Sequence, residues 1–372
     1  MTGDTSPGNG RVLITAHGAI DFPAFLPDAT RGVVRAVDSH DLVECQVPAL
    51  VMSTFHLMRQ PGTTVVAAAG DLHEFCGWHR PIMTDSGGFQ IYSMVRQNSR
   101  YGSISERGVL FRPEDGHKKL LLTPEKSIQA QLRCGADILV CLDDCTHPDD
   151  SFDTQRASVE RTVRWARRSR QEFDRITTDK NWPADARPLL YAVVQGGSSE
   201  PLRRECAQRL LEVGFDGYGF GGWPIDSDGD LVTDSLALTR SLVPEEYPMH
   251  ALGVGHPVNI ISTWNLGYDL FDSSLPTRDA RNGRLYVVRE SMIRDGRCDT
   301  EVFARLYIQD ERHVRATAPV DESCDCLCCA TYDLAYLHHL HTVGDVLFQR
   351  LATIHNLRAM VRLMRALRNS HR

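Results

Sequence analysis

The sequence predicts an α/β protein built as a (β/α)₈ barrel, with an N-terminal hairpin lid and a C-terminal subdomain appended to the barrel. Three observations predict this fold. Short apolar runs typical of buried strands recur between Phe22 and Phe271, amphipathic stretches separate several of them, and cysteines cluster from Cys324 to Cys329. The chain has 372 residues, more than the ~250 of a lone α/β barrel, which leaves room for the subdomain.

The candidate strands are short and bounded by glycine, proline or polar residues. They are Phe22–Pro27, Ala49–Thr54, Pro81–Thr84, Asp137–Leu142, Leu189–Val194, Gly217–Phe220, His250–Val254 and Asp269–Phe271. Between several of them lie stretches such as Gln155–Phe173 and Pro201–Val213, whose apolar residues recur at helical spacing. Strands that alternate with helices form parallel sheets, and eight such units close into a barrel. The first and sixth runs are weak, so a doubly wound open sheet is the alternative architecture.

The two ends of the chain differ from the alternating middle. Gly10–Ile20 is typical of a hairpin and is expected to form the lid. We expect the barrel with its active site to occupy residues 1–283, and residues 284–372 to form the subdomain and a C-terminal basic helix packed on the barrel.

The composition is that of an ordinary globular protein, with 42% hydrophobic and 24% charged residues. No run approaches the ~20 apolar residues of a membrane helix, and Met1 to Gly10 has no apolar core of the signal-peptide kind. We therefore expect a cytoplasmic protein without a membrane partner. The net charge of −7 argues against indiscriminate coating of nucleic acid.

Polar and glycine residues gather where the candidate strands end. They include Ser53 to His56, Asp85 to Gln90, Asp143 to Cys145, Gln195 to Gly197, Gly221-Gly222, Gly253 to Gly255 and Asp272. In a barrel these ends open on one face, where active sites lie. Any single aspartate there is as often a helix cap as a catalyst, and glycine pairs are usually turns. Together they suit a flat ligand rich in hydrogen-bonding groups, such as a purine.

The cysteine cluster predicts a metal site. Cys324, Cys326 and Cys329 supply three soft ligands, and a tetrahedral structural zinc requires a fourth. The spacing alone leaves His338, His339, His341 and His355 as candidates for that fourth ligand. The alternative is a buried or redox-active cysteine cluster without metal.

The last helical stretch has a row of arginines. Arg358, Arg362 and Arg365 follow i, i+4, i+7 spacing and so share one helical face, a stripe suited to phosphates. For an isolated run of charges, a solvated helix face is the alternative reading.

At this point the sequence resembles a known family, the tRNA-guanine transglycosylases, over nearly its whole length. The matching segments, in chain order, are His17-Gly18, Pro23 to Phe25, Thr84 to Gln90, Leu122 to Ser127, Asp143 to Cys145, Val194 to Gly197, Phe215 to Tyr218, Gly221-Gly222, Gly253 to Gly255, Phe271-Asp272, Pro276 to Arg278 and Ala280 to Gly283. These motifs are long and specific. The resemblance implies exchange of a guanine at the anticodon wobble position of tRNA for a free 7-deazaguanine base, a precursor of queuine.

The resemblance also implies roles for individual residues. Asp272 resembles the nucleophile that attacks C1′ of the ribose, and Asp85 the general acid/base that handles the proton of the base. The remaining implied contacts to the base are Ser86, Phe89, Asp143, Gln195, Gly222, Trp223 and Leu252.

Outside the base pocket, Arg278, Arg281 and Asn282 match positions that contact RNA. For the metal, the family pattern selects His355 as the fourth ligand, with one structural Zn²⁺ per chain. Family members are commonly homodimers, and we carry that over as an expectation.

One segment departs from the family. Bacterial enzymes usually carry Leu-Ala-Val-Gly-Glu after the glycine pair, where Trp223-Pro224-Ile225-Asp226-Ser227 stands here. His250 and Leu252 likewise replace the usual Tyr and Met. In the family the peptide after the glycines offers either its carbonyl or its N–H to the base, and Pro224 has no N–H. We therefore hypothesise a preference for a base with a donor substituent, such as the aminomethyl precursor, and bulky Ile225 argues against queuine itself.

The same departure keeps other functions open. A relative that exchanges guanine in DNA is one alternative, and a catalytically silent RNA-binding subunit is another. The retained Asp85 and Asp272 argue against the silent subunit.

Overall fold

The computed structural model describes residues 11–112, 119–180, 182–183, 186–294, 297–298 and 302–370. The expectation for Met1 to Gly10 lies outside the described residues. In the part of the chain that is described, no helix combines the length and the apolar character that crossing a membrane would require.

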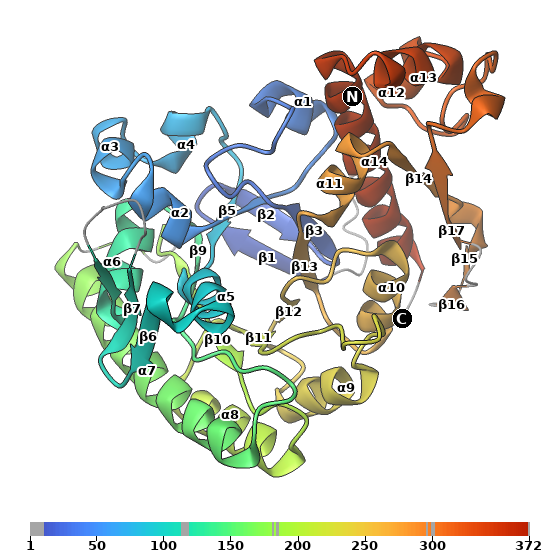
Figure 1. The fold of residues 1–372 in the computed structure, drawn as a ribbon. Helices are drawn as coiled ribbons and strands as arrows, with labels where there is room; N and C mark the ends of the chain where they lie inside the picture. The colour runs from blue at the N-terminus through green and yellow to red at the C-terminus, as the bar shows by residue number, and fades with distance from the viewer. Residues whose placement is uncertain are drawn as a thin grey trace, which may run out of the picture.

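Eight parallel strands form the barrel at the centre of the molecule (Figure 1). In chain order they are β3 (Ala24–Pro27), β4 (Leu50–Met52), β5 (Ile82–Thr84), β9 (Ile138–Val140), β10 (Leu189–Val194), β11 (Gly217–Phe220), β12 (Met249–Ala251) and β13 (Leu270–Ser273). Their order in the sheet is β3-β13-β12-β11-β10-β9-β5-β4. A parallel bridge between Asp28 and Val51 joins β3 to β4 and closes the ring. The predicted barrel is confirmed, and the open-sheet alternative is wrong.

Helices surround the barrel on its outside (Figure 1). They are α1 (Ser39–Glu44), α2 (Thr54–Arg59), α3 (Thr63–Ala68), α4 (Leu72–Cys76), α5 (Gly88–Gln97), α6 (Pro124–Arg133), α7 (Phe152–Asp179), α8 (Glu200–Val213), α9 (Thr233–Leu242), α10 (Pro257–Asn265) and α11 (Leu275–Arg281). The starts follow local chemistry: Thr123 accepts a hydrogen bond from the Lys126 N–H, and Pro124 occupies the first turn of α6. The two predicted helical stretches correspond to α7 and α8, and α7 begins and ends several residues beyond the prediction.

The predicted hairpin consists of β1 (Val12–Thr15) and β2 (Gly18–Asp21). Its His17 binds Asp137, which directly precedes β9, and Arg11 binds Asp269, which directly precedes β13. Both partners lie at amino-terminal strand ends, so the hairpin covers the mouth opposite to the polar strand ends.

A three-stranded antiparallel sheet stands between β5 and α6, and the sequence reading did not predict it. It consists of β6 (Gly102–Ser105), β7 (Gly108–Phe111) and β8 (Leu120–Leu122), preceded by a single 3₁₀ turn over Ser99–Tyr101. Its buried Val109, Phe111 and Leu122 pack in one cluster with Phe55 and Trp165, which attaches the sheet to the barrel helices.

The C-terminal region leaves the barrel and returns to it. β14 (Arg284–Val288) pairs with β17 (Phe303–Tyr307) and β15 (Ile293–Arg294) with β16 (Arg297–Cys298), followed by α12 (Leu327–Thr331), α13 (Leu334–Thr342) and α14 (Val346–Asn369). Among the residues described here, the turns Glu290–Met292 and Glu311–His313 are 3₁₀ helices in the connections.

The last helix, α14, belongs physically to the outer layer of the barrel. Its Met360 and Leu363 share a buried core with Phe25 of β3 and Phe271 of β13. α14 packs against both the barrel and the rest of the C-terminal region. The domain boundary at residue 283 therefore stays a prediction.

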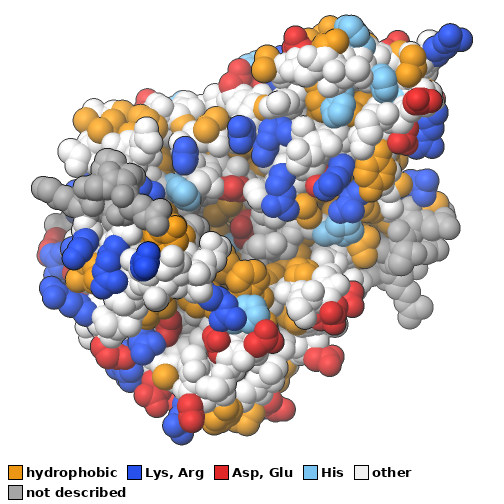
Figure 2. Space-filling model, in the orientation of Figure 1, with side chains coloured by type: hydrophobic (Ala, Val, Ile, Leu, Met, Phe, Trp, Pro, Cys, Tyr) orange, Lys and Arg blue, Asp and Glu red, His pale blue; other side chains and the backbone are white. Residues whose placement is uncertain are grey.

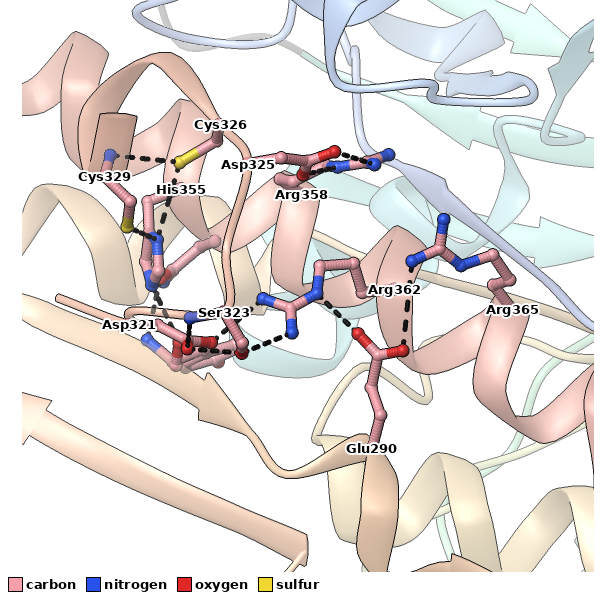
Figure 3. Close-up of polar contacts among 12 residues, drawn as sticks. Glu290, Asp321, Ser323, Asp325, Cys326, Cys329, His355, Arg358, Arg362 and Arg365 are labelled. Atoms are coloured by element: carbon pink, nitrogen blue, oxygen red, sulfur yellow. Dashed lines mark hydrogen bonds and ion pairs between the residues drawn. The ribbon is translucent and has the colours of Figure 1, made fainter. Parts of the chain in front are cut away.

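The predicted phosphate-binding stripe on α14 is wrong. Arg358 is 3% and Arg362 4% exposed, so neither reaches solvent. Arg358 makes a two-pronged ion pair with Asp325 at 2.6 Å (Figure 3). Arg362 binds Glu290 and Asp321, and Arg365 lies 3.8 Å from Glu290. Their acidic partners lie in the segments that follow β14 and precede α12. These arginines therefore attach α14 to the rest of the C-terminal region.

Candidate active site

A cavity of about 610 Å³ opens at the carboxyl ends of the barrel strands. Figure 2 shows the hollow, with acidic side chains inside it and basic side chains gathered around its rim. Most of the predicted catalytic and base-binding residues line this one cavity, namely Asp85, Ser86, Phe89, Asp143, Gly222, Trp223, Leu252 and Asp272. The fold thus brings these predicted residues together in one cavity, and their roles stay predictions.

Asp272 is held by one oxygen only. Its Oδ1 accepts hydrogen bonds from Nε2 of His250 at 2.8 Å and from the Gly253 N–H at 3.0 Å. Among the described residues nothing donates to Oδ2. The side chain is 20% exposed and lines the cavity. Such a carboxylate is fixed in orientation and still has one oxygen available to react.

Asp85 follows β5 and receives several hydrogen bonds. Oδ1 accepts from the N–H groups of Thr54 and Gly87, both at 2.9 Å, and Oδ2 accepts from Gln90 at 2.7 Å. Burial raises the pKa of Asp85 to about 6, although these donors oppose the rise. A carboxyl group with a pKa near neutrality can both give and take a proton.

Asp143 follows β9 and pairs with Gln195, whose Nε2 donates to Oδ2 at 2.7 Å. Burial raises the pKa of Asp143 to about 6, and the nearby carboxylates of Asp144 and Asp85 contribute to the rise. Gln195 lies behind Asp143 and does not itself line the cavity. Beside them, Ser86 is 5% exposed, and its Oγ accepts from the Gly88 N–H at 3.2 Å.

Aromatic rings stand at the entrance of the cavity. Phe89 is 44% exposed, and its ring centroid lies 5.6 Å from that of Trp223 in an edge-to-face arrangement. The His147 ring packs edge-to-face against the Trp223 ring, with 5.7 Å between the two centroids. An exposed ring beside a polar cavity is a surface on which a planar base can stack.

Asp28 also lines the cavity, although it was not among the site residues expected from the sequence. Asp28 directly follows β3, so the rule that polar residues stand where strands end would have found it. Burial raises the pKa of Asp28, and the Asp272 charge also raises it. Cys145, one of the residues expected where the strands end, also lines the cavity and is buried.

The three predicted RNA contacts lie at the end of α11. Arg278 is exposed and lines the cavity, whereas Arg281 is half-buried and Asn282 is exposed at the end of the helix. Burial lowers the pKa of Arg281, and the nearby charges of Arg35 and Arg278 lower it further. These arginines form a positively charged part of the rim.

Cys324, Cys326, Cys329 and His355 come together with their ligand atoms within 4.8 Å of one another, and Figure 3 shows Cys326, Cys329 and His355 of this group. Nδ1 of His355 lies 3.2 Å from Sγ of Cys329, and its Nε2 lies 2.7 Å from the Tyr286 carbonyl. A histidine that donates one nitrogen to a carbonyl presents the lone pair of the other, as metal-bound histidines do. The four residues fit a metal ion, and neighbouring Cys328 is not part of the group.

A second group, His17, His73 and Asp137, lies at the opposite mouth of the barrel. The two imidazole rings stack with 3.6 Å between centroids, and Asp137 accepts from His17 at 2.7 Å and contacts His73 at 3.3 Å. Because His17 belongs to the hairpin and contacts both His73 and Asp137, we assign this group to hairpin attachment.

A closed parallel barrel with an acidic cavity at its carboxyl mouth defines an α/β-barrel enzyme. The sequence profile of the family described as queuine tRNA-ribosyltransferase matches residues 9–371. Curated relatives called queuine tRNA-ribosyltransferase include one from Shewanella piezotolerans, 37% identical over 371 residues, which covers 99% of this chain and 91% of the relative. One from Aromatoleum aromaticum is 40% identical over 347 residues, covering 93% and 86%. The chain belongs to the queuine tRNA-ribosyltransferase family, which places it among the pentosyltransferases.

Proposed function

We propose that this protein is a tRNA-guanine transglycosylase that replaces guanine at the anticodon wobble position with a 7-deazaguanine base. The observation that carries the proposal is that Asp272 and Asp85 line the same cavity, each held in orientation by neutral donors. Family membership supports the substrate class, because the relatives are tRNA-ribosyltransferases by name.

In the proposed reaction Asp272 is the nucleophile. Its free Oδ2 attacks C1′ of the ribose while the bond from C1′ to N9 of guanine breaks, and a ribosyl ester of Asp272 results. The incoming base then attacks C1′ and releases the carboxylate. Two displacements retain the configuration at the sugar.

Asp85 handles the proton in both steps. It protonates the departing guanine and later accepts a proton from the incoming base, a role that suits a pKa of about 6. Asp143, Ser86 and the Gly222 backbone are proposed to bind the edge of the base, with Phe89 and Leu252 on its faces, while Gln195 holds Asp143 in orientation from behind. The guanine must leave its stack to enter the cavity, so a single-stranded anticodon loop is an easier substrate than a duplex.

Arg278, Arg281 and Asn282 are proposed to contact the nucleotides that flank the target. We further propose that the Cys₃His group holds one structural zinc ion, because three thiolates and an imidazole are its usual ligands. The zinc would tie α12 to α14, and a homodimer remains an expectation from the family.

The base preference is proposed to follow from Pro224. The Pro224 carbonyl accepts from the Val232 N–H at 3.0 Å, and Ile225 pairs with Leu231, so the segment forms a small antiparallel turn. With no N–H at Pro224, the peptide after Trp223 offers only its carbonyl, which favours an aminomethyl substituent over a nitrile. Exchange rates of the aminomethyl, nitrile and full queuine bases test this, and equal use of the nitrile base contradicts it.

Trapping on a denaturing gel tests the proposed function. The protein is incubated with tRNA or with DNA of matched sequence plus free base, and a band shifted by the mass of the chain is sought. An adduct with tRNA only supports the proposal. An adduct with DNA only establishes the DNA alternative, and no adduct with either favours a silent RNA-binding subunit.

A further inference from the structure

A buried arginine stands directly behind the base-binding wall of the cavity. Arg203 of α8 is 2% exposed, and the sequence reading placed no function on it. Its Nε donates to the Gly197 carbonyl at 2.6 Å and its Nη2 to the Gly221 carbonyl at 3.1 Å. Nη1 donates to the Val194 carbonyl at 3.2 Å and to Oγ1 of Thr239 at 3.1 Å. The guanidinium thus links the carboxyl ends of β10 and β11.

The charge of Arg203 has no ion-pair partner among the residues that the structure describes. All its hydrogen-bond acceptors are neutral, and its guanidinium lies 4.3 Å from the centroid of the Phe220 ring, which lines the cavity. Burial lowers the pKa of Arg203 to about 10, so the group stays cationic at neutral pH. A buried cation without a counter-ion is unfavourable, and such groups concentrate at functional sites.

The peptide between Gly221 and Gly222 connects this charge to the cavity. Its carbonyl points to Arg203, and in a trans peptide the N–H points the opposite way. Gly222 lines the cavity, beside Cys145, so the N–H on the far side of this peptide lies on the cavity side of the wall. A cation at the carbonyl end polarises the peptide and makes its N–H a stronger donor toward the cavity.

We propose that Arg203 is a positioning residue that stabilises, through the Gly221–Gly222 peptide, the negative charge that develops on the departing base. The inference rests on the proposed function. As Oδ2 of Asp272 bonds to C1′, the C1′–N9 electron pair passes to the purine, and conjugation carries part of that charge to O6. A polarised N–H at the cavity wall stabilises this oxygen in the way an oxyanion hole does, until N9 takes the proton of Asp85.

Two substitutions separate charge from geometry. Arg203→Met removes the charge and keeps an extended side chain, whereas Arg203→Lys keeps the charge but cannot span the three carbonyls. Arg204→Met is the matched control, because Arg204 is exposed on the same helix and pairs with Glu200. We expect kcat for guanine exchange to fall about 100-fold in Arg203→Met and about tenfold in Arg203→Lys, with KM for tRNA unchanged.

The leaving group provides a readout that a purely structural role does not move. In a tRNA anticodon stem-loop that carries 8-azaguanine at the target position, the departing base accepts negative charge more readily. The effect of Arg203→Met on kcat should then shrink to about tenfold or less. An effect of equal size for both bases, or equal losses in the Met and Lys variants, overturns the proposal.

The polarised peptide can also be observed without any turnover. In glycine-labelled protein the amide resonance of Gly222 should move upfield in Arg203→Met and stay in place in Arg204→Met. If the wild-type chain exchanges no base, the proposed function fails. The amide resonance of Gly222 then tests separately whether Arg203 polarises the Gly221–Gly222 peptide. A Gly222 resonance that stays in place in a folded Arg203→Met variant contradicts the polarisation.

Discussion

Nε2 of His250 donates to Oδ1 of Asp272 at 2.8 Å, and His250 itself is 1% exposed. Because a carboxylate oxygen can only accept, Nε2 carries the proton. Nδ1 is buried and has no hydrogen-bond partner in the described part of the chain, which favours its role as the unprotonated nitrogen. His250 and the Gly253 N–H therefore hold one oxygen of Asp272 and leave the other without a donor in the described part of the chain.

Replacing the histidine should slow the formation of the Asp272 ester. His250→Phe keeps an aromatic ring but removes the donor, and a hydrogen bond to a charged group is worth about 1.5 to 3 kcal/mol, or about 10- to 100-fold in rate. His250→Gln, which retains an N–H at a similar distance, should recover most of the rate. Rapid-quench measurement of adduct formation checks this, and a Phe variant within threefold of wild type contradicts it.

Asp272→Asn should abolish the covalent adduct, because an amide oxygen is a far weaker nucleophile than a carboxylate. Exchange of labelled guanine into tRNA should fall by about 1,000-fold or more. Asp226→Asn, in the exposed loop after the cavity wall, is the matched control and should exchange normally. An Asp272→Asn variant that still forms an adduct would assign the nucleophile to another residue.

Asp85→Asn should stabilise the fold at alkaline pH while it impairs exchange. Burial raises the folded-state pKa of Asp85 to about 6, above the value of about 4 in unfolded chains. Protonated Asp85 therefore favours folding below pH 4, and that contribution disappears as the pH rises through 6. At pH 8 the Asn variant should gain up to about 3 kcal/mol in the free energy of unfolding. Urea unfolding at pH 8 and pH 4.5 checks the sign, since the gain must shrink at the lower pH.

Removal of the metal should destabilise both the C-terminal region and the barrel, because α14 packs against both. We expect one zinc per chain by elemental analysis, loss of that zinc in Cys326→Ser, and a lower midpoint of thermal unfolding. Cys328→Ser is the control, since Cys328 is equally buried but outside the cluster. Zinc retained by Cys326→Ser would exclude the assigned ligand set.

Arg362 and Arg278 should differ in what their loss affects. Arg362→Ala leaves Asp321, which has an 8% exposed side chain, without its partner and should cost about 3 to 5 kcal/mol of stability. Arg278→Ala should leave stability unchanged but weaken tRNA binding and reduce its salt dependence by about one counterion. Filter binding at several salt concentrations distinguishes the two variants. Weaker RNA binding by a folded Arg362→Ala protein would support the phosphate-binding stripe on α14 that the structure argues against.

The barrel and the residues of its cavity could be predicted from sequence because polar or glycine residues follow the apolar run of each strand and so mark its carboxyl end. Leu189–Val194 and Gly217–Phe220 are found with their predicted bounds. The sheet of β6, β7 and β8 was missed, because it is an antiparallel insertion outside the alternation of strands and helices from which the barrel was predicted.

Interactions between segments distant in the chain were harder to predict. Arg362 and Arg203 both look like solvated helix residues, and only the fold shows that one meets carboxylates and the other meets backbone carbonyls. Helical spacing shows which residues share a face, but it does not show what that face contacts.

The hairpin of β1 and β2 has a kinetic consequence. It covers one end of the barrel, so in the proposed reaction the outgoing guanine and the incoming base would both use the carboxyl mouth, where the nucleic acid is proposed to bind. The first product must depart past the bound RNA before the second reactant can enter, which predicts ping-pong kinetics with parallel lines in double-reciprocal plots.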